Sequence, residues 1–326
     1  MISSDSIEQI LQVTQATAIQ STESIQTLWS GYGEIVRVHL QGGNKETVIA
    51  KWVQPPTTRQ QPRGWNTDLS HQRKLRSYQV ESQWYRHYSS RLEDPCRVAD
   101  CYLVHSQEDK HLFLLEDLDA VGFDRRHSAL DAKRVRLVLT WLANFHASFL
   151  GTSPNGLWPT GTYWHLNTRP EEFAAIDDGN PLKEMAATID QKLAQCEFQT
   201  LVHGDAKVAN FCFSSDLSRV AAVDFQYVGG GCGMKDVAYF LGSCQSEDQC
   251  ERDSDIYLDY YFDQLRGAIE RQSISVSFAQ LETQWRPLYP LAWADFHRFL
   301  IGWCPGHHKL HRYTRQMTKQ ALASIT

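Results

Sequence analysis

Hydrophobic and polar positions alternate along the first third of the chain, as they do in β-strands. Two such runs occupy residues 31–53 and flank the turn-forming stretch Gln41-Gly42-Gly43-Asn44-Lys45, a pattern typical of an antiparallel hairpin. Residues 101–106 and 110–118 form a second pair of the same kind. The first third of the chain is therefore expected to build an antiparallel sheet.

Helical spacing replaces this alternation elsewhere. A short helix is expected within residues 5–27, behind Ser4 and Asp5 as possible caps. Residues 54–70, rich in Pro, Gln and Arg and without periodicity, predict a long exposed and mobile flap. Residues 73–92 have helical spacing and end before an Asp-Pro pair, a natural helix stop. Further helices are expected at 130–150, 182–196, 256–272, 278–303 with interruptions at Pro287 and Pro290, and 309–323.

These segments predict an α+β protein with two lobes. The β-rich N-lobe, residues 1–118, is expected to hold the antiparallel sheet and one helix after its first hairpin. The C-lobe, residues 119–326, is expected to be helical apart from a small hairpin around residues 201–213. With 326 residues the chain exceeds the roughly 250 to 300 residues at which a single hydrophobic core stops growing.

Composition excludes several classes of protein. With 42% hydrophobic and 21% charged residues, the chain is globular rather than disordered or fibrous. The net charge of −6 leaves no overall basic surface for nucleic acid or an anionic membrane. Because there is no signal-like N-terminus and no run of about 18 apolar residues, we expect a soluble cytoplasmic protein with no membrane partner. The eight scattered cysteines favour reduced thiols over disulfides.

The most distinctive polar stretch is LVHGDAKVANFCF, where a His-Gly-Asp sequence lies between apolar runs and Asn210 follows Asp205 by five residues. This spacing is typical of a catalytic loop in which a carboxylate accepts a hydroxyl proton and an amide holds a metal ion. Asp224, in AAVDFQ, follows the next apolar strand and supplies a second carboxylate. Hard oxygen ligands from Asn210 and Asp224 favour Mg2+ on nucleotide phosphates.

Phosphoryl transfer also requires a cation that reaches the nucleotide phosphates from elsewhere in the fold. Lys51, in the strand VIAKWV, is the candidate, and Glu81 on the following helix would orient it. Each residue alone has a plainer interpretation, since Lys51 could be a strand-edge lysine and Glu81 a solvated helix position. Their order in the chain together with Asp205, Asn210 and Asp224 favours the catalytic interpretation.

These motifs resemble the protein-kinase-like phosphotransferases of small molecules, the superfamily of aminoglycoside phosphotransferases and choline kinases. Within it, the chain most closely resembles the ecdysteroid kinase-like family over roughly residues 25 to 315. The stretches that carry the resemblance are HGDAKVAN, VDFQ, YQVESQWY, LLEDL and KDVAYFL.

The resemblance implies a two-lobed protein-kinase-like fold with ATP and Mg2+ as cofactors. Asp205 would be the catalytic base, assisted by Lys51 and Glu81, while Asn210 and Asp224 would bind the metal. Lys51 would contact the α- and β-phosphates of the nucleotide. The other implied positions are Glu116, Asp117 and Leu118, whose backbone would meet the adenine, and Asp236, which would brace the catalytic loop.

A glycine-rich loop is implied less completely. GYGEIVRV has Gly31 and Gly33 where kinases place two glycines that cover the phosphates, but Val36 stands where the third belongs. We therefore expect only Gly31 and Gly33 to take part in nucleotide binding.

The expected activity is transfer of the γ-phosphoryl group of ATP to a hydroxyl of a small molecule, with a steroid-like, choline-like or aminoglycoside-like acceptor left open. A nucleotide-binding but inactive scaffold and a protein kinase are the alternatives. The scaffold is disfavoured because no catalytic position is lost, and the protein kinase because Gly204 replaces the arginine of HRD. The oligomeric state is also left open.

Two further groups have open interpretations. Tyr163, Trp164, Trp293, Asp295 and Trp303 either pack in the core, which is favoured for each one alone, or line an acceptor site. Such a site would suit a flat apolar alcohol or a quaternary amine, the latter bound by cation–π contact with a nearby carboxylate. The cluster of Cys304, His307, His308 and His311 either binds a metal or is a hydrogen-bonded or substrate-facing group. The metal is disfavoured because only one thiol is present and nothing upstream pairs with it.

Overall fold

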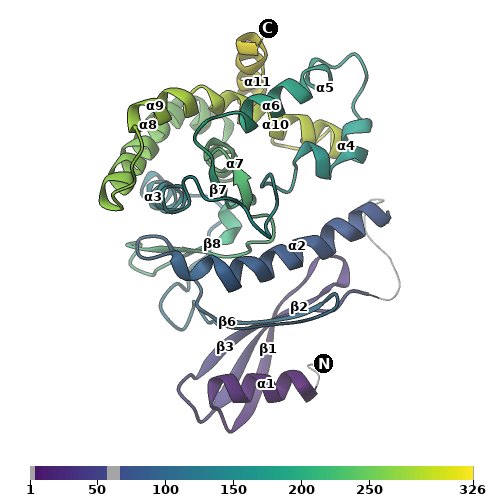
Figure 1. The fold of residues 1–326 in the computed structure, drawn as a ribbon, viewed down its shortest axis with the longest axis vertical. Helices are drawn as coiled ribbons and strands as arrows, with labels where there is room; N and C mark the ends of the chain where they lie inside the picture. The colour runs from purple at the N-terminus through teal and green to yellow at the C-terminus, as the bar shows by residue number, and fades with distance from the viewer. Residues whose placement is uncertain (1–3, 57–66, 326) are drawn as a thin grey trace.

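The computed structural model of the protein describes residues 4–56 and 67–325 and has two parts stacked along its long axis (Figure 1). The lower part in the figure is a sheet with two helices, and the upper part is mainly helical. The α+β architecture predicted from the sequence is confirmed. Residues 57–66, which form most of the expected flap, lie outside the described residues.

The lower sheet is antiparallel throughout, with the strand order β1-β2-β3-β6-β5. Both hairpins predicted from the alternating pattern are present in it, β2 with β3 and β5 with β6. The bounds are β1 Ala18–Thr27, β2 Gly33–Gln41, β3 Thr47–Val53, β5 Cys101–Gln107 and β6 Lys110–Glu116.

The two faces of this sheet pack against different helices. On one face, Val36 and Val48 join Ile10 of the first helix, α1 (Ser4–Thr14), in a small core. On the other face lies the long helix α2 (Asp68–His87), between the sheet and the helical lobe (Figure 1). Side chains alternate along a strand, so Lys51 points to the opposite face from Val48. The strand period therefore directs Lys51 toward α2.

The expected helix within residues 5–27 is correct only for its first half. The helix ends at Thr14, and residues 18–27 form the edge strand β1 paired with β2. The sequence of β1, AIQSTESIQT, shows little apolar alternation because eight of its ten residues are exposed. An edge strand that buries neither face leaves no periodic signal for sequence analysis to detect.

The helical lobe surrounds two small sheets. One pairs β7 (Thr200–Val202) with β10 (Gly229–Gly231), and the other has the order β4-β9-β8. The remaining strands are β4 Arg97–Val98, β8 Phe211–Phe213 and β9 Val220–Ala222. The helices are α3 Ala132–Ser148, α4 Pro170–Ala174, α5 Pro181–Glu184, α6 Ala186–Ala194, α7 Met234–Cys244, α8 Glu247–Arg271, α9 Phe278–Trp285, α10 Leu288–Trp303 and α11 Arg312–Ile325. Across both lobes, the described residues also form the short 3-10 turns η1 Trp29–Gly31, η3 Ser89–Arg91, η4 Leu166–Thr168 and η5 Val208–Asn210.

Only one of the two predicted proline interruptions occurs. The chain breaks between α9 and α10 at Pro287, but Pro290 lies in the first turn of α10. The amide groups of a first helical turn have no intrahelical partner, so a proline there sacrifices no hydrogen bond. The expected interruption at Pro290 is therefore wrong.

The two lobes share backbone hydrogen bonds. Strand β4, which precedes residue 118, runs parallel to β9 of the helical lobe and pairs Arg97 with Ala221. The division of the chain after residue 118 remains a prediction. Within the described parts of the chain, every helix is too short or too polar to cross a membrane.

Candidate active site

The His-Gly-Asp stretch forms a tight loop between β7 and β8. Gly204 has a φ of +77°, and a Cβ atom there would lie 2.0 Å from the carbonyl oxygen of Tyr227, so only glycine fits. His203 donates from Nε2 to the carbonyl of Val223 at 3.0 Å and accepts at Nδ1 from the amide of Asp205 at 3.3 Å. The imidazole thus connects the loop to the strand that precedes Asp224.

Asp236, in the first turn of α7, holds this loop through its backbone amides. Its carboxylate accepts the backbone N–H groups of His203 at 2.6 Å and Gly204 at 3.0 Å. His146 of α3 contacts the same carboxylate at 3.2 Å, and both side chains are fully buried. Helices α7 and α3 therefore act together to fix the backbone that presents Asp205.

Asp205 lies in a dense polar environment. Lys207 contacts Oδ2 at 2.8 Å, and the Tyr239 hydroxyl donates to Oδ1 at 3.2 Å. The Asn210 amide donates to the Asp205 backbone carbonyl at 2.8 Å and to Oδ2 at 3.2 Å. Burial raises the pKa of Asp205; the Lys207 ammonium opposes the shift without cancelling it, and the charge of Asp224 adds to it.

Asn210 and Asp224 lie side by side because the amide of Val223 donates to the carbonyl of Asn210 at 3.0 Å. Burial alone would raise the pKa of Asp224, but nearby ammonium groups, that of Lys51 foremost, lower it to about 2. Among the described residues, no hydrogen bond uses Asn210 Oδ1 or Asp224 Oδ2. An ionised carboxylate and an amide oxygen are a donor set that fits Mg2+.

Lys51 and Glu81 form a buried ion pair with 2.7 Å between Nζ and Oε1, and Lys51 Nζ lies 3.6 Å from Asp224 Oδ1. Burial would lower the pKa of Lys51, but the carboxylates of Glu81 and Asp224 outweigh it and raise the pKa. The sequence prediction that a helical carboxylate orients Lys51 matches this contact.

A second lysine reaches the same carboxylate from α2. Lys74 donates to the side-chain oxygen of Gln226 at 2.8 Å, and Gln226 donates to Asp224 Oδ1 at 2.5 Å. Burial lowers the pKa of Lys74 to about 8, against the opposing charge of Asp224. Two ammonium groups on separate elements therefore act on Asp224.

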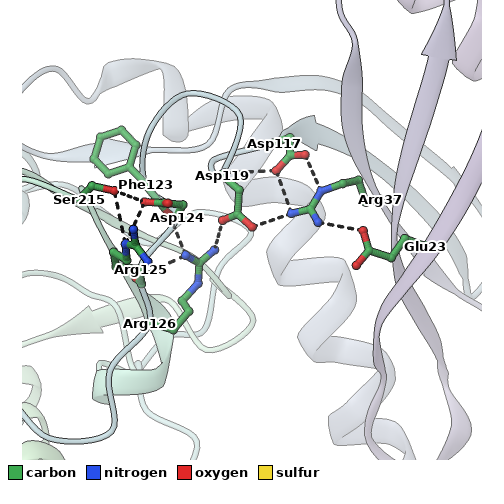
Figure 2. A network of polar contacts seen from close by, with 9 residues as sticks. All are labelled: Glu23, Arg37, Asp117, Asp119, Phe123, Asp124, Arg125, Arg126 and Ser215. Atoms are coloured by element: carbon green, nitrogen blue, oxygen red, sulfur yellow. Dashed lines mark hydrogen bonds and ion pairs between the residues drawn. The ribbon is translucent and has the colours of Figure 1, made fainter.

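The segment between the lobes is held by arginines (Figure 2). Arg37 of β2 donates to Asp117 at 2.7 Å and to Asp119 at 2.6 Å, and Arg126 contacts Asp119 at 2.8 Å. The Glu116 carboxylate pairs with Arg97. Since these side chains are engaged, any contact of residues 116–118 with a nucleotide base would use backbone groups. That contact remains a prediction.

The two glycines of the expected phosphate loop have different environments. A Cβ atom on Gly33 would lie 1.9 Å from the carbonyl oxygen of Trp52, so the pairing of β2 with β3 explains this glycine. Gly31 has a φ of +73° and open space around its Cα. Their roles in nucleotide binding remain predictions.

Aromatic side chains gather around Tyr239, whose hydroxyl contacts Asp205. We call this group the acceptor-side cluster, which consists of Tyr163, Trp164, Tyr239, Phe296, Phe299 and Trp303. Trp293 does not belong to it, since it packs against Tyr313 at 5.2 Å between ring centroids. Asp295 is buried and accepts from Trp164 at 3.0 Å and from Arg298 at 2.9 Å.

The cysteine-histidine cluster beyond α10 does not form a metal site. No three His, Cys, Asp or Glu side chains in residues 4–56 and 67–325 come together as metal ligands would. The rings of His307 and His308 stack on each other at 4.4 Å, and that of His307 lies 5.7 Å from that of Trp303.

The model of the ecdysteroid kinase-like family matches residues 35–151 and 164–273, more than half of the chain. The chain belongs to the ecdysteroid kinase-like family. This confirms the resemblance inferred from HGDAKVAN, VDFQ and the accompanying motifs. Lys51, Glu81, Asp205, Asn210 and Asp224 all lie within the matched residues.

Three solved structures are similar over nearly the whole chain. A microcompartment-associated aminopropanol kinase is 14% identical, with 98% of this chain and 95% of that chain covered and a TM-score of 0.49. The choline kinase LicA from Streptococcus pneumoniae is 14% identical, with 97% and 99% covered and a TM-score of 0.47. An aminoglycoside 2'-phosphotransferase-IIIa with GDP is 12% identical, with 97% and 96% covered and a TM-score of 0.49. The comparison with curated proteins gave no match.

Four residues that contact the site of this ecdysteroid kinase-like protein were not singled out from the sequence, namely Lys74, Lys207, Gln226 and Tyr239. Lys74 precedes Glu81 by seven residues, so the helical period alone could have placed it on the same face of α2. Gln226 and Tyr239 lie inside the motifs VDFQ and KDVAYFL, where only the acidic residues received roles.

Proposed function

We propose that this ecdysteroid kinase-like protein transfers the γ-phosphoryl group of ATP, with Mg2+, to a hydroxyl group of a small molecule. One observation carries the proposal: Lys51, Asp224, Asn210 and Asp205 lie in one continuous set of contacts. Lys51 reaches Asp224 at 3.6 Å, Asn210 reaches Asp205 at 2.8 Å, and the backbone joins Asn210 to Val223 at 3.0 Å.

Asp205 is the group that would act on the acceptor. Its carboxylate accepts the hydrogen bond of the attacking hydroxyl and takes up the proton as the new oxygen–phosphorus bond forms, while the bond between the γ-phosphorus and the β,γ-bridging oxygen breaks and ADP leaves. The braced loop supports this role, because a backbone fixed by Asp236 and His203 holds the carboxylate without further rearrangement.

Asn210 and Asp224 would hold Mg2+, which supplies positive charge to neutralise the nucleotide phosphates. Lys51 orients the α- and β-phosphates, and the Glu81 pair fixes its ammonium group. Lys74, held through Gln226, and Lys207, beside Asp205, add positive charge where the transferred group becomes most negative. Most of the rate acceleration is then positioning and electrostatics.

Two alternatives have less support. An inactive scaffold would require loss of the base, a metal ligand or the lysine, and all are present with their contacts. A protein kinase would carry an arginine where Gly204 stands, and a side chain at that position would meet the carbonyl of Tyr227. The family leaves steroid-like, choline-like and aminoglycoside-like alcohols as acceptors.

The test is ADP formation with MgATP and pools of small alcohols, followed by mass spectrometry of the alcohol. We expect ADP to form faster with one pool than without acceptor, and one alcohol to gain a phosphoryl group. Nucleotide binding without turnover on any alcohol, or phosphorylation of a generic protein substrate instead, would reject the proposal. The exposed Asp255→Asn on α8 serves as a surface control and should behave as the wild type.

A further inference from the structure

The acceptor side of Asp205 contains a cation that belongs to the chain itself. Lys309 lies in the connection between α10 and α11, and its ammonium nitrogen is 5.1 Å from the ring centroid of Tyr239 and 5.7 Å from that of Phe296. Both rings belong to the acceptor-side cluster. Lys309 therefore occupies the ring faces that a cationic ligand would use.

Tyr239 connects this lysine to the catalytic carboxylate. The Tyr239 hydroxyl donates to Asp205 Oδ1 at 3.2 Å, while the face of the same ring lies under the Lys309 ammonium. Asp205 and the Lys309 ammonium group therefore contact the same side chain, one at its hydroxyl and the other at its ring face.

Asp205 is the first carboxylate that acts on the charge of Lys309, and it is engaged by Lys207 at 2.8 Å. The carboxylates of the helices around the acceptor-side cluster are also engaged by other groups. Asp295 accepts from Arg298 and Trp164, and Glu172 pairs with Arg169 at 3.1 Å. Within the described part of the chain, no hydrogen bond or ion pair reaches the ammonium nitrogen of Lys309. Lys309 is half-buried, and a half-buried ammonium without a carboxylate in contact is a ready partner for an anion.

The charge state of Lys309 agrees with this role. Burial lowers the pKa of Lys309 to about 8, against the opposing effect of the Asp205 carboxylate. With this pKa, Lys309 is protonated in most molecules near pH 7, so an anion would meet a positive charge.

We propose that Lys309 recognises an acidic group on the acceptor, so that the substrate is an alcohol with an apolar body and a carboxylate-like group rather than an amino alcohol. This inference rests on the proposed function of the same site. An apolar body would pack against Tyr163 and Trp303, the two rings of the cluster that are only partly buried, and its anionic group would pair with the ammonium. A choline-like or aminoglycoside-like amine would have to displace Lys309 from the rings or accept its repulsion.

The test uses three probes with the same body and different charge. They are trans-4-(hydroxymethyl)cyclohexanecarboxylate, its neutral carboxamide, and the corresponding aminomethyl alcohol. With the wild-type protein, MgATP turnover and the thermal shift in the presence of a non-hydrolysable ATP analogue are measured for each probe. We expect the carboxylate to bind at least about tenfold more tightly than the amine, with the amide between them.

Substitutions at one position then assign this order to Lys309. Lys309→Met should lower affinity for the carboxylate about tenfold and raise affinity for the amine, Lys309→Glu should reverse the order, and Lys309→Arg should keep it. The matched control is Lys319→Met, which removes an exposed lysine from α11 and should leave the order unchanged. Loss of folding alone would weaken all three probes equally and would not reverse their order.

The outcomes separate this inference from the proposed function. Two results with the wild type would overturn the role of Lys309: preferential phosphorylation of the aminomethyl alcohol, or equal binding of the carboxylate and the amine probes. An order of affinities that stays unchanged in Lys309→Met and Lys309→Glu would overturn it as well. Binding in the expected order without any phosphoryl transfer would support the role of Lys309 and reject the kinase activity.

Discussion

The loop that carries Asp205 and the proposed nucleotide side of the site are held in place by different kinds of contact. Around Asp205 the supports are mainly backbone amides and carbonyls, which bond to His203 and Asp236. On the nucleotide side they are side-chain pairs between distant parts of the chain, such as Lys51 with Glu81 and Arg37 with Asp117. The first arrangement fixes one backbone conformation, while the second fixes only where side-chain tips meet.

This contrast suggests a division of labour in the site. A backbone held by a buried carboxylate and by glycine geometry has one conformation, so the catalytic loop would act as a fixed platform. Paired side chains on the sheet, α2 and the interlobe segment can separate and re-form, as nucleotide entry would require. Substitutions should therefore damage the loop through its backbone and the nucleotide side through its charges.

The largest effect is expected for Gly204→Ala. The new methyl group would lie 2.0 Å from a backbone carbonyl at a positive φ, and neither backbone can move easily. We expect a loss of about 4 kcal/mol or more in the free energy of unfolding, measured by urea denaturation. Gly151→Ala is the matched control: its φ is +73° but the space is open, so only about 1 kcal/mol should be lost. Equal losses in the two variants would show that the loop backbone is not rigid.

Lys51→Met tests the charge pairs of the nucleotide side. It would leave the Glu81 carboxylate buried without its partner, which should lower the free energy of unfolding by about 3 to 5 kcal/mol. In the double variant Lys51→Met/Glu81→Met most of this stability should return, while phosphoryl transfer should not. The exposed Lys110→Met is the control. A double variant as unstable as the single one would show that packing rather than charge holds this pair.

A smaller effect is expected from pH through His111 of β6, whose imidazole accepts or donates a hydrogen bond with Ser106 at 2.9 Å. Burial lowers the pKa of His111 to about 4, below the usual value of about 6.5 in the unfolded chain. The unfolded state therefore binds more protons between these values, and stability falls as pH drops from 6.5 to 4. Urea denaturation at pH 7.5 and 5 should show about 1 to 3 kcal/mol more loss for wild type than for His111→Gln. Equal losses would exclude this source.

The smallest effect is expected for Arg37→Gln, which removes the contacts to Asp117 and Asp119 drawn in Figure 2. Because the arginine is partly exposed, its loss should weaken transition-state stabilisation by only about 1 kcal/mol, which corresponds to roughly a fivefold loss in kcat/KM for ATP. Glu23→Gln removes only the exposed partner of Arg37 and should change little. An unchanged KM for ATP in Arg37→Gln would show that the interlobe segment does not need this clamp.

The same contrast explains which parts of the protein could be predicted from its sequence. HGDAKVAN and VDFQ are short motifs that could be recognised from the sequence alone. They identified Asp205, Asn210 and Asp224, which the structure then connects through the contacts of Asn210 with Asp205 and with Val223. Lys74 reaches its partner Gln226 across 152 residues, and no local pattern announces such a pair. Side-chain meetings of this kind depend on the packing of the lobes.

The fold shows the same limit. The hairpins β2–β3 and β5–β6 have buried strand positions and left a recognisable β-strand pattern, but the exposed strand β1 left none and was expected to be helical. Proline has no backbone N–H donor and usually interrupts a helix, so an interruption was expected at Pro290. The helix starts at Leu288, and in its first turn no N–H group is needed for an intrahelical hydrogen bond. Position within an element, which sequence alone gives poorly, decided both cases.

The most direct test of the central claim compares Asp205→Asn with Asp224→Asn in the same two assays. Both should lower acceptor-dependent ADP formation by about a thousandfold or more, since one removes the base and the other a metal ligand. Affinity for an ATP analogue with Mg2+ should stay within about threefold in Asp205→Asn and fall at least about tenfold in Asp224→Asn. Turnover close to that of the wild type in either variant would contradict the assignment of Asp205 and Asp224 to phosphoryl transfer.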